Sequence, residues 1–172
     1  VQTTPLMGIV FQDAANTAVY VAQNKTGVSL AGSDVIFSIE AEHQISSVDG
    51  PSAGALMTLV MISALKNQPL DPGVTLTGTI DKDGHVGAIG GVIEKATAAQ
   101  ENKKILFLLP KENSELVQYT TKRTSYGGLV LVERVPERIS AQDYIRKNIG
   151  INVTIVDSID DVIAAGPKTV LI

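Results

Sequence analysis

Hydrophobic and polar positions alternate in short blocks through the first third of the chain. Apolar and β-branched residues cluster at residues 6–11, 17–21 and 35–39, and Asp, Asn and Gly separate the clusters. Short clusters of this kind, bounded by turn-forming residues, are typical of β-strands. The pattern therefore predicts three strands and a β-rich opening third.

From residue 52 to residue 67 the pattern becomes helical. Leu56, Val60 and then Ser63 follow one another at three-to-four spacing, and nearly all other positions are apolar as well. Such a pattern predicts a helix that is buried on most of its sides. Its longest nearly apolar run, residues 55–65, is shorter than the roughly 20 residues that a membrane helix requires.

Strands and helices alternate through the rest of the chain. We expect strands at residues 74–79, 85–89, 104–109, 129–133 and 152–156, and helices at residues 92–100, 113–119, 141–147 and 158–165. Asp83 and Gly84 predict a tight hairpin turn, Ser158 an N-cap and Gly166 a helix stop. Strands followed by mixed strand and helix units predict one α+β, or mixed α/β, domain over residues 1–172.

Composition narrows the chemistry that such a domain can perform. The chain has 172 residues, 44% of them hydrophobic, which suffices for one well-packed core. A net charge of -4 with scattered Lys and Arg argues against a nucleic-acid partner. Because the chain has no cysteine, nucleophilic chemistry falls to Ser, Thr, Lys or a carboxylate.

The first residues bear on localisation. They carry neither a basic segment nor an apolar signal core, so we expect a cytoplasmic protein. A membrane-anchored or extracytoplasmic location stays open, because the sequence starts without Met and segments outside it are not seen.

One candidate site is the sequence Asp-Gly-Pro-Ser-Ala-Gly at residues 49–54, where a polar loop meets the predicted buried helix. A proline in the first helical turn and an acidic residue before it are ordinary helix-start chemistry. The same residues also suit catalysis, because backbone N–H groups at a helix start can bind an oxyanion. Taken alone, the motif favours the ordinary helix start.

The second candidate site is a Gly-Gly pair at residues 90–91 followed by Lys95 in the first turns of a helix. A surface lysine paired with Glu94 or Glu101 would gain little energy. Alternatively, the positive helix N-terminus and burial together lower the pKa of the amine. An ordinary lysine, with a pKa of about 10.4, requires roughly 4 to 5 kcal/mol to be neutral at pH 7. A lowered pKa would therefore make Lys95 a credible general base.

Together, in this order and at this separation, the two motifs resemble the proteolytic domain of Lon proteases, archaeal-type Lon-like proteases included. The resemblance implies that Ser52 is the nucleophile and Lys95 the general base of a Ser-Lys dyad peptidase. It also implies that Thr77, in a Thr-Gly pair between the motifs, supports the Lys95 amine. Pro-Lys-Glu-Asn at residues 110–113 matches a further segment of the family.

The resemblance carries further expectations. Asp49 would order the loop or lie at the substrate edge, and Gly50, Pro51 and Ala53 would supply the oxyanion donors or the substrate edge. The fold would be that of Lon proteolytic domains, which is similar to the second domain of a small-subunit ribosomal protein. Unfolded or peptide substrates and a homo-oligomer, such as a ring of six, are the expected partners. No metal or cofactor is expected, and ATP would act only through an ATPase region outside this chain.

The resemblance is close over residues 48–113 and weaker over residues 152–165, and the sequence departs from the family in two places. Bacterial Lon proteases often carry histidines on the strand before the serine, whereas this chain has Ser38 and Glu40 there and His43 further along. The segment at residues 115–151 is longer than the connection in the family. We expect it to be a lid or a contact to a partner or another copy.

Other chemistries fit the sequence less well. A Ser-His-Asp triad would need His43 or His85 beside Ser52, but His85 follows a turn and is expected to be exposed. A calcium loop starting at Asp81 fails, because its twelfth position is Val92 where glutamate is required. The competing function is a non-catalytic binding or assembly module of the same fold. Such a module has no reason to retain Ser52 and Lys95 together.

Overall fold

The computed structural model describes residues 2–4, 6–40 and 45–166, and a three-stranded parallel sheet lies at its centre. The strand order is β11 (Asn152–Val156), β8 (Leu106–Pro110) and β5 (Val74–Leu76), so β8 pairs on both sides. Four of the five β8 residues are buried. A parallel sheet of this kind needs cover on both faces.

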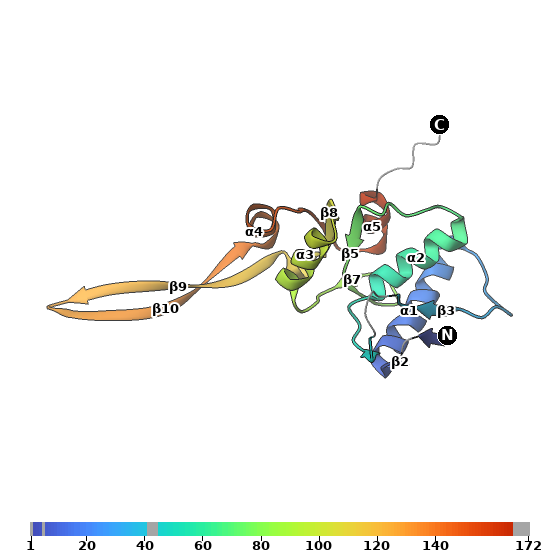
Figure 1. The fold of residues 1–172 in the computed structure, drawn as a ribbon, viewed down its shortest axis with the longest axis horizontal. Coiled ribbons are helices and arrows are strands. Elements are labelled where there is room, and N and C mark those ends of the chain that lie inside the picture. Colours follow the sequence, from blue (N-terminus) through green and yellow to red (C-terminus); the bar gives the residue numbers. More distant parts are fainter. Residues whose placement is uncertain (1, 5, 41–44, 167–172) are drawn as a thin grey trace, which may run out of the picture.

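Helices supply that cover on each side of the sheet (Figure 1). Leu108 of β8 belongs to one hydrophobic cluster with α1 (Ile9–Thr26), α2 (Gly54–Lys66) and α5 (Ile159–Ala165). Its neighbours Phe107 and Leu109 belong to a second cluster with α3 (Val92–Glu101) and α4 (Ala141–Asn148). Successive side chains of a strand point to opposite faces, so one apolar strand serves both clusters.

Helix α1 covers residues 9–26, so the strand predicted at residues 17–21 is wrong and the one predicted at residues 6–11 is wrong beyond Met7. Only β2 (Leu6–Met7) is extended there, and α1 occupies the rest. Phe11, Ala14, Ala15 and Ala18 are buried at three-to-four spacing and pack with Met57 of α2. Alanine is the best helix former, and its small side chain lets two helices approach closely. The period of the alanines outweighs the strand preference of the β-branched residues among them.

Short strand pairs frame this helical layer. β1 (Gln2–Thr4) pairs in parallel with β3 (Ile36–Ser38), and β2 pairs in parallel with β4 (Ser47–Val48). The strand predicted at residues 35–39 is thus confirmed over residues 36–38. The strand predicted at residues 74–79 instead breaks into β5 and β6 (Thr79–Ile80), which pairs antiparallel with β7 (Val86–Gly87). The hairpin turn predicted at Asp83 and Gly84 joins β6 to β7.

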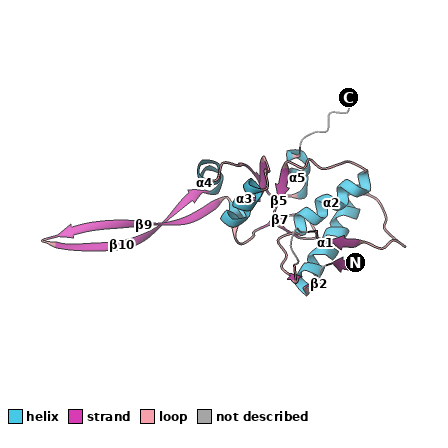
Figure 2. Ribbon diagram, viewed as in Figure 1, coloured by secondary structure: helices cyan, strands magenta, loops and turns pink. Residues whose placement is uncertain are grey.

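A long β-hairpin projects from the body (Figure 2). β9 (Glu115–Tyr126) and β10 (Leu129–Ser140) pair antiparallel from end to end and are joined by Gly127 and Gly128, both with positive φ. The helix predicted at residues 113–119 is wrong. Only the 3-10 turn η1 (Lys111–Asn113) precedes β9, whose β-branched and aromatic residues suit a strand. The strand predicted at residues 129–133 is confirmed and continues to Ser140.

The predictions for the C-terminal part are confirmed. α4, β11 and α5 lie at the expected positions. The side chain of Ser158 accepts a hydrogen bond from the backbone of Asp161, and the Asp161 carboxylate accepts from the Ser158 backbone. This reciprocal pair is a capping box, and Gly166 ends the helix.

Candidate active site

Ser52 lies in the loop between β4 and α2, and the break between β5 and β6 holds that loop in place. The N–H of Gly78 donates to the Ser52 carbonyl at 2.9 Å, and the N–H of Ala55 donates to the Gly78 carbonyl at 3.1 Å. The Thr77 hydroxyl donates to the same Ser52 carbonyl at 3.3 Å. Two hydrogen bonds therefore fix the Ser52 carbonyl, and a third ties the start of α2 to the same interrupted strand.

Two glycines permit this close approach. A Cβ on Gly78 would collide with the Val86 side chain and lie 3.3 Å from the Ala55 Cβ. A Cβ on Gly54 would lie 2.7 Å from a methyl group of Ile80. Larger residues at either position would push the start of α2 away from β6 and β7. Both glycines of the predicted motifs are thus required by packing.

Asp49 caps a helix that is distant in sequence. Its Oδ1 accepts from the backbone N–H of Phe11 at 3.0 Å and from that of Gly50 at 2.8 Å. Phe11 is the third residue of α1, whose N-cap, Gly8, has no capping side chain and no room for a Cβ beside the Asp49 carboxylate. A carboxylate at a helix N-terminus satisfies otherwise unpaired N–H groups. These contacts favour a loop-ordering role for Asp49 over a role at the substrate edge.

Lys95 projects from the first turns of α3. The N-cap of this helix, Gly91, has a φ of 66°, a left-handed conformation that glycine adopts without strain. The Lys95 amine donates to the Gly90 carbonyl at 3.0 Å. Partial burial lowers the pKa of this amine. Within the described residues, the ion pairs of the structure do not include Lys95.

A groove of about 400 Å³ brings Ser52, Thr77 and Lys95 together. Its remaining walls come from the start of α2, from β5 and β8 and from one face of α3; they are Ala53, Leu56, Thr75, Leu76, Ala98, Ala99, Asn102, Lys104 and Phe107. Residues that are 43 positions apart in sequence, Ser52 and Lys95, therefore line one surface.

Sequence reasoning missed three polar residues of this groove, Thr75, Asn102 and Lys104. Helical spacing could have found Asn102, because it lies seven positions after Lys95 on the same helix face. Thr75 likewise lies two positions before Thr77 on an extended segment. The Lys104 amine donates to the Pro72 carbonyl at 2.8 Å, and no sequence pattern marks this contact.

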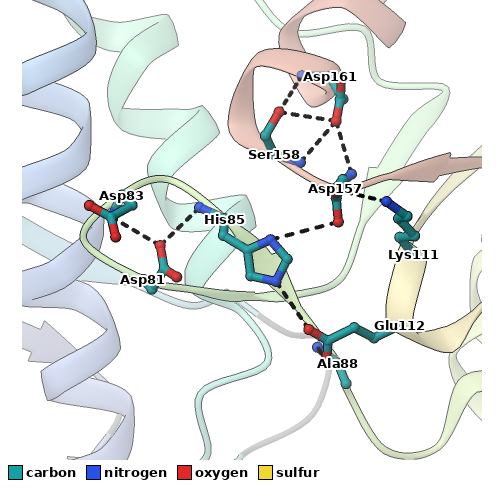
Figure 3. Close-up of polar contacts among 9 residues, drawn as sticks. All are labelled: Asp81, Asp83, His85, Ala88, Lys111, Glu112, Asp157, Ser158 and Asp161. Atoms are coloured by element: carbon teal, nitrogen blue, oxygen red, sulfur yellow. Dashed lines mark hydrogen bonds and ion pairs between the residues drawn. The ribbon is translucent and has the colours of Figure 1, made fainter.

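The structure gives no support to the alternative of a Ser-His-Asp triad. His85 is not part of the groove wall; its Nε2 lies 3.0 Å from Glu112 Oε1 and its Nδ1 lies 3.7 Å from Asp157 Oδ1 (Figure 3). The hydrogen bond to Glu112 raises the pKa of the His85 ring. His43 lies outside the described residues.

Metal-binding clusters and membrane-spanning helices are both missing from the described part of the chain. Across residues 2–4, 6–40 and 45–166, no group of three or more His, Asp or Glu side chains is placed to bind a metal ion. Within these limits, no helix combines the length and the apolar character needed to cross a membrane.

Comparison with known proteins decides the family. The family described as the Lon protease (S16) C-terminal proteolytic domain matches residues 2–127. The chain belongs to this family. Ser52, Thr77 and Lys95 all lie inside the matched residues, and the prediction of a Lon-type proteolytic domain with an α+β fold is confirmed.

Individual Lon proteases are similar over part of the chain. A Lon protease of Finegoldia magna is 33% identical over 121 residues, which are 68% of this chain and 16% of that protein. A Lon protease of Mesomycoplasma hyopneumoniae is 32% identical over 109 residues, 62% of this chain and 12% of its own length. A mitochondrial Lon protease homolog of Eremothecium gossypii is 42% identical over 65 residues, 38% of this chain and 6% of its own length. The chain thus spans less than a fifth of each of these relatives.

Proposed function

We propose that this domain is a serine-type endopeptidase that hydrolyses peptide bonds in unfolded proteins or peptides, with Ser52 as nucleophile and Lys95 as general base. The observation that carries the proposal is the groove that Ser52, Thr77 and Lys95 share. Two further findings support it: the lowered pKa of the Lys95 amine and the membership of the Lon proteolytic family. A neutral amine near a serine can take the place that histidine holds in a triad.

The proposed reaction proceeds through an acyl-enzyme. Neutral Lys95 accepts the Ser52 hydroxyl proton as Oγ attacks the scissile carbonyl, and the resulting ammonium donates that proton to the departing amine. Water then attacks the Ser52 ester, again with Lys95 as base, and releases the second product. In the structure the Lys95 amine donates to the Gly90 carbonyl. A neutral amine has two N–H donors and one lone pair, so the proposal requires that the amine keep this bond and direct its lone pair to the Ser52 hydroxyl when substrate is bound. Catalytic hydrogen bonds commonly tighten only in the substrate complex.

The loop at residues 50–54 offers two candidate oxyanion donors. The Gly54 N–H already donates to the Pro51 carbonyl and the Ala55 N–H to the Gly78 carbonyl. The N–H groups of Ser52 and Ala53 have no acceptor among the described residues. We assign the oxyanion to these two groups, since preorganised backbone donors stabilise developing charge. Gly50, with a φ of 108°, and Pro51 shape the turn that presents them.

Thr77, which lines the same groove, is proposed to support the Lys95 amine. Its hydroxyl proton is directed to the Ser52 carbonyl, so the oxygen lone pairs remain available to an amine donor. One hydroxyl would then connect the nucleophile backbone with the base.

Intact-mass measurement with a peptide boronate tests the assignment of the nucleophile. The wild-type domain is expected to gain one boronate mass located on Ser52, and Ser52→Ala is expected to gain none. Ser52→Ala and Lys95→Ala should each abolish peptide cleavage, and the double variant should be no worse than either single variant because the two residues act as a unit. Cleavage retained in either folded variant would contradict the dyad, and a folded wild-type domain without any cleavage would favour the binding-module alternative.

We further propose that the domain self-associates, with a ring of six as the expected form. Relatives named Lon protease support the comparison but extend far beyond the aligned region. Closed rings are a common outcome of head-to-tail interfaces. Sedimentation velocity over a range of concentrations should show a species larger than the monomer, and a monomer at every concentration would contradict self-association of this domain.

A further inference from the structure

The segment from Ala88 to Gly90 connects β7 with α3 and ends at the carbonyl group that holds the Lys95 amine. This segment belongs to no helix or strand. The Gly90 carbonyl accepts from Lys95 Nζ at 3.0 Å, so a shift of the segment would move the amine. The contacts that hold these three residues therefore bear on the position of the amine.

Asn113 binds the backbone of Ile89 twice. The Ile89 N–H donates to Asn113 Oδ1 at 2.9 Å, and Asn113 Nδ2 donates to the Ile89 carbonyl at 3.0 Å. An amide side chain carries both a donor and an acceptor, so it can pair with a peptide group as a neighbouring strand would. Alanine would remove both bonds, and aspartate would keep only the acceptor.

Glu112 binds the preceding residue. Its Oε2 accepts from the Ala88 N–H at 3.2 Å, and its Oε1 lies 3.0 Å from His85 Nε2 (Figure 3). Three side-chain contacts from η1 thus reach two successive backbone residues, Ala88 and Ile89. Since η1 directly follows β8, the central strand, these contacts tie the segment to the least exposed part of the sheet.

We propose that Asn113, with Glu112 beside it, is a positioning residue for the catalytic base: it holds the backbone whose next carbonyl, that of Gly90, places the Lys95 amine. The inference rests on the proposed Ser52–Lys95 function and assigns a task to the Pro-Lys-Glu-Asn segment. Asn113 does not line the groove, so it acts on the reaction only through the backbone.

A role in stability alone makes a different prediction from a role in positioning. Asn113→Ala should lower kcat about ten- to a hundred-fold with little change in KM, because a misplacement of about 1 Å can reduce a rate a hundred-fold. The rise of kcat with pH should also move to lower pH, because a carbonyl acceptor favours the charged ammonium and its loss lowers the pKa of the amine. The kcat of Asn113→Asp should lie between that of Asn113→Ala and that of the wild type.

The measurement compares kcat, KM and the pH profile of peptide cleavage in protein whose folded fraction is checked by circular dichroism. Asn148→Ala is the matched control: Asn148 Nδ2 donates to the Tyr144 carbonyl within α4, away from the groove, and its loss should leave kcat and the pH profile unchanged. Wild-type kcat in folded Asn113→Ala would overturn the positioning role. A fall in kcat with an unmoved pH profile would also overturn it. Cleavage by folded Ser52→Ala or Lys95→Ala would instead overturn the proposed function.

Discussion

At the scale of a single side chain, Thr77 contacts one candidate catalytic residue, Ser52, and lines a groove with the other, Lys95. Its hydroxyl donates to the Ser52 carbonyl and faces the same groove as Lys95. It is one of only two buried polar residues among those described; the other is Thr58, whose hydroxyl donates to the Gly54 carbonyl within α2. A hydroxyl buried beside a reactive pair can serve the fold, the reaction or both.

Replacement of Thr77 separates these roles. Thr77→Val keeps the shape and removes the hydroxyl; the loss of one hydrogen bond of about 1 to 3 kcal/mol should lower the cleavage rate about ten- to a hundred-fold. Thr75→Val, two positions earlier and in the same groove, is the control and should change the rate little. Steady-state kinetics on both variants tests this, and an unchanged rate in Thr77→Val would show that another group positions Lys95.

The proposed role of the Lys95 amine fixes the direction in which the cleavage rate depends on pH. Burial disfavours the ammonium and lowers its pKa. Because the proposed base is the neutral amine, kcat should rise with pH through this lowered pKa, below the range of an ordinary lysine. Cleavage rates measured from pH 6 to pH 10 on protein that stays folded test the expectation. A rate independent of pH across that range would contradict Lys95 as the base.

The β9–β10 hairpin stands apart from the body at the scale of elements. Apart from Leu116, which packs against the second hydrophobic cluster near the base, its side chains are largely exposed. Tyr126, Leu129 and Val130 near the tip are each at least 60% exposed. Two-stranded ribbons are marginally stable alone, so contacts at the base and any partner of the tip determine how the hairpin holds its shape.

Shortening the hairpin tests how much it contributes to the stability of the body. Replacing residues 119–136 with an Asn-Gly turn would leave the paired residues Gln118 and Glu137 opposite each other. The free energy of unfolding of the body should change by less than about 0.5 kcal/mol, as for surface changes without core contacts. Urea unfolding measures this. A much larger loss would show that the ribbon supports the core, and a loss of self-association would identify it as a contact between copies.

At the scale of the whole molecule, His85 links the β6–β7 turn to η1 and to the start of α5. Its ring contacts Glu112 and Asp157, while Asp81 accepts from its backbone N–H and Lys111 binds Asp157 (Figure 3). Backbone hydrogen bonds from Val86 to Asp157 and from Ile159 to Gly84 connect the same parts. The cluster joins three regions that are distant from one another in sequence.

The charge of His85 should make this link depend on pH. Glu112 raises the pKa of His85, and His85 lowers the pKa of Glu112. The contribution of His85 to the free energy of unfolding is therefore fully present below the pKa that histidine has in the unfolded chain. It is lost as pH rises through the raised pKa of the folded protein. The contribution of Glu112 to the free energy of unfolding is present at higher pH and is lost as pH falls through the lowered pKa of the folded protein. The ion pair is strongest between these two limits.

Urea unfolding of wild type and His85→Gln across pH tests the expectation. The wild type should be the more stable protein in weakly acidic solution, and the difference should shrink above the folded pKa of His85. Lys25→Gln, which removes an exposed ion pair with Asp160, is the control and should show no such change near neutral pH. A difference between wild type and His85→Gln that does not vary with pH would contradict a charged contact.

Local signals in the sequence are sufficient for much of the fold and for the choice of candidate site residues. Helix α3 begins after the Gly-Gly pair as predicted, and α5 carries the expected Ser158 cap. Caps, turns and helix starts depend on residues within a few positions of each other, so residue types at short spacing determine them. For the same reason, the motifs around Ser52 and Lys95 stand out in the amino-acid sequence alone.

Only the tertiary structure decided the rest, because the deciding partners are distant in sequence. Asp49 caps α1 across 38 positions, Thr77 reaches Ser52 across 25, and Asn113 reaches Ile89 across 24. Residues 9–26 form a helix because Phe11 and the alanines of α1 pack against α2. The alanines favour a helix and the β-branched residues between them favour a strand, and the contact with α2 decides in favour of the helix. The sequence by itself determined which residues are candidates for the chemistry, and packing decided what holds them in place.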